Sequence, residues 1–193
     1  VRLANGEKAA EAAEFWEEKS RVYDSLRPAI EPDGFASHDE ALLSRRSMIR
    51  AFRRSIAKAD VFVFTLGLTE GWENAATGQP YPMCPGTVAG RFDAAAHVFR
   101  NYGVAEVSRD MTEAIAAMRG INPGLRVLLT VSPVPLTATC SGNHVLVATT
   151  YSKSALRAVA GELAAADPGI DYFPSYEIIS GAPARAGFFA PNM

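Results

Sequence analysis

The sequence has no apolar run near the roughly 20 residues that a membrane-spanning helix needs. Its net charge is -2 at pH 7 and it has no dense Lys/Arg cluster, which argues against nucleic acid and an acidic membrane as partners. Its two cysteines, Cys84 and Cys140, form no CxxC pair and have no histidine at metal-ligand spacing. We therefore expect reduced, partly buried thiols in the cytoplasm, no cofactor or metal, and no nucleic acid or membrane partner.

Several motifs that carry chemistry are also missing. The sequence contains no GxxxxGK[ST] phosphate loop, no GxGxxG after a strand, no GxSxG nucleophile elbow and no HExxH. The three histidines, His38, His97 and His144, lie far apart in the sequence. These absences argue against a nucleotide-binding domain and against an ordinary α/β-hydrolase.

What the sequence does contain is typical of a globular protein, with 48% hydrophobic and 21% charged residues. Residues 1–38 are expected to form an irregular arm, with a short helix over Ala9–Lys19 and a Pro-Asp-Gly turn ending at Gly34. Residues 39–193 are expected to form an α/β body, so that residues 1–193 make a single domain.

Helical periodicity and short apolar runs alternate along the body. The periodicity predicts helices over Asp39–Lys58, Glu106–Arg119 and Tyr151–Ala166, the last capped by Thr149 or Thr150. The apolar runs predict strands over Asp60–Leu66, Leu125–Val131 and Ile170–Phe173. Five arginines in the first helix, which we interpret as its solvated face, are Arg45, Arg46, Arg50, Arg53 and Arg54.

This order predicts an α/β sandwich with a mostly parallel central sheet and right-handed crossovers. The run Asp60–Leu66 is expected to be central and buried on both faces, and the loop over 71–103 is long enough to cover a site. Ligands bind beyond the carboxyl ends of parallel strands. The candidate site therefore lies where the three strands end, at Gly67–Trp72, Ser132–Pro135 and Pro174–Glu177.

Five segments in order carry a family resemblance: DVFVFTLGLTEGW (60–72), YPMCPG (81–86), LTVSPVPLTAT (129–139), ATTYSKSALRAVAGELA (148–164) and DYFPSYEII (171–179). From about Trp16 to its end, the chain resembles the bacterial GSCFA domain family. The resemblance implies a flavodoxin-like, SGNH-hydrolase-like fold. Most members of the SGNH superfamily are esterases, acetyl hydrolases or acyltransferases, so the family implies such a role only through its fold relatives.

The resemblance also implies that the chain is an internal fragment, truncated at both ends. The Gly-Ser-Cys-Phe-Ala motif, whose serine is the nucleophile in related enzymes, is absent from the sequence. The chain also stops near the place where such enzymes supply a histidine. Since the missing first strand would lie next to Asp60–Leu66, we expect that strand to have an unpaired, sticky edge.

The resemblance assigns catalytic candidates after the first strand. Gly67, Thr69 and Glu70 stand where related enzymes have a GxND block whose asparagine helps to form the oxyanion hole. Thr69 replaces that asparagine, and its hydroxyl is expected to donate one hydrogen bond. Glu70 either orients a base, binds a substrate hydroxyl, or meets a backbone N–H at a helix start. Trp72 either stacks on a sugar ring or seals the strand end.

His144 is the one histidine near a strand-end loop, so it is a candidate general base or, alternatively, a residue that bonds the loop backbone. The contiguous Ser141–His144 string spells SGNH by accident and is interpreted as a turn. Substrate-binding candidates are Trp72, Ser132, Tyr151, Ser152, Lys153, Tyr176 and Glu177. For Ser152 and Lys153 the alternative is a first-turn cap and a solvated ammonium.

Two functions follow as expectations. One is a serine esterase or acyltransferase that acts on a small ester, such as a carbohydrate O-acetyl group, with the nucleophile outside these residues. The other is a non-catalytic module that binds a glycan or small ligand through a degenerate SGNH site. The sequence leaves the oligomeric state open.

Overall fold

The computed structural model describes residues 14–184 and 187–188. Its residues fall into two compact units, which we describe separately. The first unit contains the described residues up to Lys58, with Gly71–Arg100 and Ala117–Pro123. The second contains Ala59–Glu70, Asn101–Ala116 and the described residues from Gly124 onward. The chain is therefore a mixed α/β protein in which each unit is assembled from separate segments.

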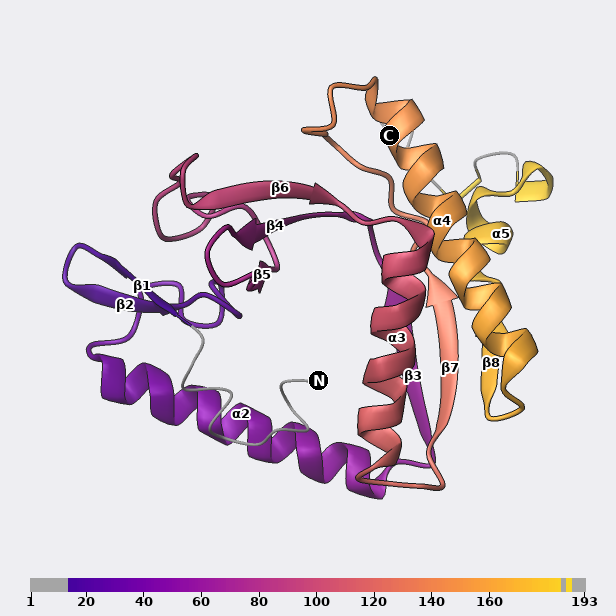
Figure 1. Cartoon of the computed structure of the whole chain (residues 1–193), viewed down its shortest axis with the longest axis horizontal. Coiled ribbons are helices and arrows are strands. Elements are labelled where there is room, and N and C mark those ends of the chain that lie inside the picture. Colours follow the sequence, from indigo (N-terminus) through magenta and orange to yellow (C-terminus); the bar gives the residue numbers. More distant parts are fainter. Residues whose placement is uncertain (1–13, 185–186, 189–193) are drawn as a thin grey trace. The chain divides into compact units, whose positions relative to one another are not determined.

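The second unit is built on a three-stranded parallel sheet in the order β3-β7-β8. Its strands are β3 (Val61–Leu66), β7 (Arg126–Val131) and β8 (Ile170–Phe173), which confirms the three predicted strands within one residue. Helix α4 (Val145–Ala166) packs against β7 and β8, as Figure 1 shows. The apolar core between them includes fully buried side chains from the sheet and the helix: Leu129, Val131, Val159 and Ala160.

The helices of this unit agree with the sequence pattern except at their ends. Helix α3 (Val104–Arg119) matches the prediction, whereas α4 begins at Val145 and not near Tyr151. His144, not Thr149 or Thr150, caps α4 by accepting a hydrogen bond from the Leu146 N–H. A further helix, α5 (Ser175–Ser180), follows β8, and the 3-10 turn η1 spans Ala182–Ala184.

Strand β3 lies at an edge of its sheet, so the prediction that it is central and buried on both faces is wrong. Three of its apolar side chains are exposed: Val63 at 59%, Val61 at 42% and Phe64 at 39% of full exposure. Two hydrogen bonds show which backbone groups of β3 face β7: the Arg126 N–H donates to the Asp60 carbonyl, and the Ser132 N–H donates to the Leu66 carbonyl. Because the N–H and C=O groups alternate in direction along a strand, those of Val61, Val63 and Thr65 point to the side away from β7. In the described chain this side pairs with no strand.

We expect the 193-residue chain to associate at micromolar concentration through this edge, because unpaired backbone groups and exposed valines form a template for strand addition. Val63→Lys is expected to shift the chain toward monomer in sedimentation velocity. Val134→Lys is the matched control, since Val134 is equally exposed (57%) but lies outside the strands. A wild-type chain that sediments as a monomer would contradict the expectation.

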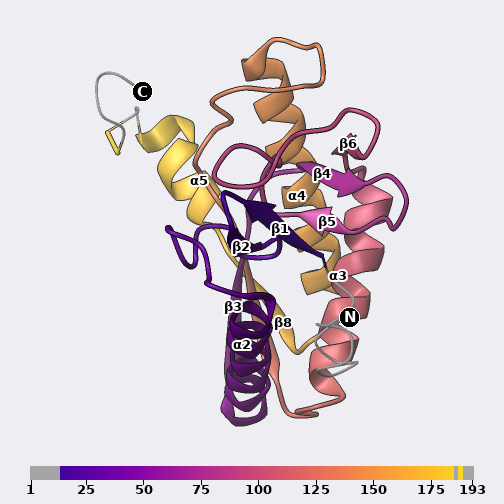
Figure 2. The ribbon, with the colours of Figure 1, turned by 90° about the vertical axis from the view of Figure 1, so that its left-hand side faces the viewer.

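The first unit begins with a hairpin of β1 (Phe15–Glu18) and β2 (Arg21–Asp24), which Figure 2 shows beside α2 (His38–Lys58). The predicted helix over Ala9–Lys19 is therefore wrong from Phe15 onward, and residues 9–13 lie outside the described residues. Lys19 and Ser20 form the turn with φ of 49° and 63°. Both values lie in the left-handed region, as a tight two-residue hairpin turn requires.

The segment predicted as a long loop contains three strands. They are β4 (Glu70–Asn74), β5 (Pro80–Tyr81) and β6 (His97–Asn101), in the sheet order β5-β4-β6. β4 and β5 pair antiparallel with Trp72 opposite Tyr81. Of the three strands, only the end residues Glu70 and Asn101 belong to the second unit.

Helix α2 confirms the helix predicted over Asp39–Lys58, but its arginines do not all face solvent. Arg45 is fully buried and paired with Asp24, which is also buried. Arg45 also lies over the Phe15 ring, 3.8 Å from its centroid. The interpretation of Arg45 as part of a solvated face is therefore wrong, because β2 supplies a carboxylate that keeps the guanidinium inside.

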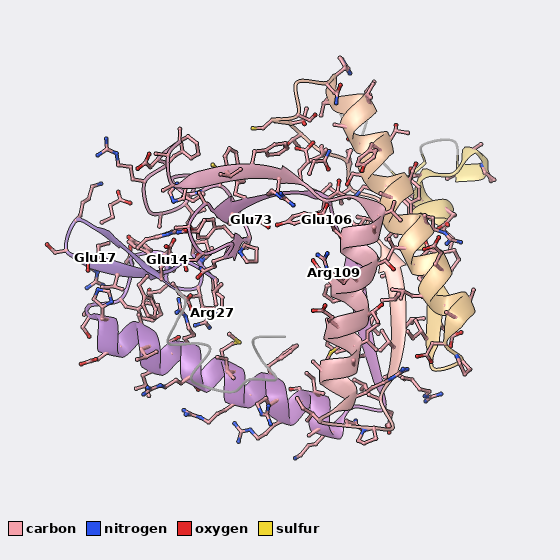
Figure 3. The ribbon with its side chains drawn as sticks, in the orientation of Figure 1. Glu14, Glu17, Arg27, Glu73, Glu106 and Arg109 are labelled. Atoms are coloured by element: carbon pink, nitrogen blue, oxygen red, sulfur yellow. The ribbon has the colours of Figure 1, made fainter. Side chains whose placement is uncertain are left out.

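Asp24 is the centre of a buried polar network. It accepts hydrogen bonds from Arg45, from the Leu26 N–H and from Arg27, which is labelled in Figure 3. Burial by itself raises the pKa of Asp24, but the Arg45 and Arg27 hydrogen bonds and the Arg45 charge outweigh it and hold the pKa below 3.8. The network thus ties the hairpin to α2 through charged groups.

Candidate functional site

The loop that follows β3 is held by two neighbouring residues of α4. Ser152 Oγ accepts a hydrogen bond from the Thr69 N–H at 2.9 Å, and Lys153 Nζ donates one to the Gly67 carbonyl at 2.8 Å. All four residues belong to the second unit. The structure therefore brings together four sequence-predicted site residues at the carboxyl end of β3.

These two bonds fix the direction of two successive peptide groups. In a trans peptide the N–H points opposite to the preceding carbonyl, and the described chain has no cis peptide bond. Because the Gly67 carbonyl is turned toward Lys153, the N–H of Leu68 is directed away from it. Leu68 is 43% exposed, and no described residue accepts a hydrogen bond from its N–H. The two hydrogen bonds of Ser152 and Lys153, which we call the clamp, thus present the Leu68 N–H as a backbone donor at the end of β3.

Lys153 is a buried cation, with 1% of its surface exposed. The described residues supply its ammonium with one hydrogen-bond acceptor, the Gly67 carbonyl, and with no carboxylate. Burial lowers the pKa of Lys153 to about 8. The alternative predicted for Ser152 and Lys153, a first-turn cap and a solvated ammonium, is wrong, because both residues are buried and lie well past the first turn of α4.

Thr69 is joined to the end of β6 by two bonds. Its hydroxyl donates to Asn101 Oδ1 at 2.7 Å, and its carbonyl accepts from the Tyr102 N–H at 2.8 Å. The Thr69 side chain is 1% exposed, and both its N–H and its hydroxyl proton are taken by protein acceptors. The structure therefore gives Thr69 no free donor for an oxyanion. Asn101, which the sequence analysis missed, holds an exposed amide beside it.

Glu70 is hydrogen-bonded to the loop between β7 and α4. Its carboxylate accepts a hydrogen bond from the Thr139 hydroxyl, which in turn lies 2.8 Å from Ser141 Oγ. Glu70 begins β4 and not a helix, so the helix-start alternative does not apply. The carboxylate holds the loop between β7 and α4 against the end of β3.

The remaining candidates of the second unit have local roles. His144 is exposed and caps α4 through Nδ1, and Ser132 Oγ accepts from the Val134 N–H at 3.2 Å. Tyr151 is 46% exposed. Glu177 accepts hydrogen bonds from Arg157 and from the Tyr172 hydroxyl. No described contact joins these side chains to Gly67 or Thr69.

Tyr176 and Trp72 lie in separate surroundings. Tyr176 lines a shallow surface depression with Arg157, Gly161 and Glu162. Trp72 belongs to the first unit, where its ring packs edge-on against Phe92 and Phe99 at centroid distances of 5.2 and 5.7 Å. This packing agrees with the structural alternative for Trp72.

Within the described residues no three His, Cys, Asp or Glu side chains are placed to hold a metal ion. The same residues contain no helix with the length and apolar character needed to span a bilayer.

Comparison with known proteins places the chain in a family. Searches of curated proteins and of solved structures gave no match. The model of the GSCFA family matches residues 3–193. Because this match covers nearly the whole chain, the protein belongs to the GSCFA family.

Proposed function

We propose that the end of β3 is the acyl-binding half of a serine esterase or acyltransferase site in an SGNH-like fold. The observation that carries the proposal is the clamp made by Ser152 and Lys153, which fixes the peptides of Gly67–Thr69. Donors held rigidly where negative charge develops are the main source of catalysis in acyl transfer. Family membership adds support, because related enzymes place an oxyanion hole after this strand.

The proposed reaction uses a serine from the Gly-Ser-Cys-Phe-Ala motif, which is not among these 193 residues. That serine attacks a small ester, with a carbohydrate O-acetyl group as the candidate substrate, and a histidine accepts its proton. The carbonyl oxygen of the tetrahedral intermediate accepts a hydrogen bond from the Leu68 N–H. Lys153 strengthens this donor, since its charge polarises the same peptide group through the Gly67 carbonyl.

The test is fluorophosphonate labelling of a protein that carries both this chain and the motif, read by intact mass. A single adduct on the motif serine is the expected result, together with hydrolysis of p-nitrophenyl acetate. Folded protein that gives no adduct, while a serine hydrolase control is labelled, would contradict the esterase proposal.

One observation favours the alternative of a ligand-binding module without turnover. Thr69, which stands in place of the oxyanion asparagine, has both of its donors taken within the protein. Such a site would bind a polar ligand such as a glycan and catalyse nothing. Two results together distinguish this function from the esterase proposal. Ligand binding stays unchanged when the motif serine is replaced by alanine, and the protein that keeps this serine shows no hydrolysis.

A further inference from the structure

We infer that Asn101 is a substrate-contacting residue of this site, and that Thr69 is the positioning residue that orients its amide toward the acyl oxygen. The inference rests on the proposed function and adds a second oxyanion donor, from β6, to the Leu68 N–H. Its basis is the bond between the Thr69 hydroxyl and Asn101 Oδ1, 2.7 Å long.

The bond settles which end of the Asn101 amide is available. The amide oxygen accepts the Thr69 proton, so the Nδ2 group carries the two N–H donors that remain. No described residue accepts a hydrogen bond from Nδ2, and the Asn101 side chain is exposed. An asparagine amide that is fixed at its oxygen and open at its nitrogen is a preorganised donor.

Thr69 is itself locked in place, which makes it suited to orient another residue. Its backbone bonds to Ser152 and Tyr102 hold it from both sides, and its side chain is almost fully buried. The hydroxyl therefore has little freedom to follow a different acceptor. The side-chain N–H donor that an asparagine directly after β3 was expected to supply thus comes from Asn101 of β6, whose amide Thr69 orients.

The two donors are linked through Thr69. Leu68 immediately precedes Thr69, and Asn101 is bonded to the Thr69 side chain. An oxyanion between the Leu68 N–H and Asn101 Nδ2 would be bound from two sides, as in oxyanion holes built from one backbone and one side-chain donor. The class of ligand that this pair fits is the tetrahedral oxyanion of an ester, or the carboxylate released from it.

The first arm of the test is kinetic and uses the protein that carries both this chain and the motif serine. Asn101→Asp keeps an oxygen for Thr69 but removes both N–H donors, and is expected to lower kcat for p-nitrophenyl acetate by about 10²–10³-fold, with a smaller change in KM. Thr69→Val is expected to lower kcat roughly 10- to 100-fold, and Thr69→Ser to restore it. Asn143→Asp, at an exposed loop asparagine, is the matched control.

The second arm does not depend on turnover. In ¹H–¹⁵N spectra of the same protein with the motif serine replaced by alanine, titration with acetate is expected to shift the Asn101 side-chain amide pair. The pair is assigned by its absence in Asn101→Asp. Thr69→Val is expected to weaken the shift, whereas Thr69→Ser keeps it, which a purely structural role for Thr69 would not produce.

The outcomes separate the two proposals. Hydrolysis that is equally fast in Asn101→Asp would overturn the role of Asn101 and leave the esterase proposal standing. An acetate-dependent shift of the Asn101 amide would support the binding role, and it would contradict the esterase proposal only if the protein that keeps its motif serine shows no hydrolysis. An Asn101 amide that does not respond to acetate overturns the inference whatever the kinetics show.

Discussion

Replacing Asp24 with alanine is expected to lower the free energy of unfolding of the first unit by about 3–5 kcal/mol. The side chains of Asp24 and Arg45 are both 0% exposed, and Arg45 is anchored beneath the hairpin by its contact with Phe15. Removal of the carboxylate deprives a guanidinium in the interior of the counter-charge that Asp24 supplies. The cost of that buried charge exceeds the cost of the lost hydrogen bonds, which makes this the most destabilising single change that we expect in the unit.

Denaturant unfolding followed by the fluorescence of Trp16, a buried residue of this unit, measures the effect. Asp33→Ala, at an exposed aspartate in the turn before Phe35, is the matched control and is expected to change stability by less than about 0.5 kcal/mol. The double variant Asp24→Ala, Arg45→Met is expected to recover much of the loss, because the buried guanidinium is removed together with its counter-charge. Equal stability of Asp24→Ala and Asp33→Ala would contradict the interpretation.

The pKa of Asp24 adds a pH dependence to the same prediction. Because the folded pKa lies below 3.8, the stabilisation from Asp24 is complete above pH 3.8 and is lost as the pH falls through the folded pKa. The gap in unfolding free energy between the wild type and Asp24→Ala should therefore be constant near neutral pH and should narrow in acid.

The sequence predicts those helices and strands of this protein that follow from the pattern of apolar residues over a short stretch. The helix α2, the helix α3 and the three parallel strands follow from periodicity and apolar runs, which act over a few residues. The β1–β2 hairpin was missed because its turn, Lys19-Ser20, lacks the glycine or asparagine that marks a left-handed turn. The start of α4 was missed because its first turn, where Leu146 and Val147 are exposed, does not form an amphipathic pattern.

The sequence predicted that candidate residues lie at the end of β3, but it did not predict their contacts. The carboxyl end of β3 follows from the rule for parallel sheets, and Gly67, Thr69, Ser152 and Lys153 do meet there. Which donors are free depends on partners far away in the sequence, since Thr69 and Ser152 are 83 positions apart and Thr69 and Asn101 are 32 apart. Local pattern carries no information about such pairs, and the same limit explains why the burial of Arg45 was missed.

The stability of the second unit is expected to rise between pH 8 and pH 10 because of Lys153. A lysine ordinarily titrates near 10.5, whereas burial lowers the pKa of Lys153 to about 8. In this pH window the unfolded chain binds a proton that the folded chain has released, so the free energy of unfolding increases with pH. A shift of this size corresponds to at most about 3 kcal/mol. Lys153→Met removes the titrating group, and the unfolding free energy of the wild type minus that of the variant should rise across the window.

Thermal melts of both proteins at intervals from pH 7 to pH 10 measure this difference. Above pH 10 the tyrosines act in the opposite direction: burial, with the Glu14 hydrogen bond, raises the pKa of Tyr81 to about 12, so its stabilisation is lost as the pH rises toward that value. The window below pH 10 therefore isolates Lys153. Lys58→Met, at an exposed lysine that ends α2, is the matched control for the loss of a lysine side chain. A flat difference for Lys153→Met would mean that the Lys153 ammonium keeps an ordinary pKa, and that no buried charge polarises the Gly67–Leu68 peptide.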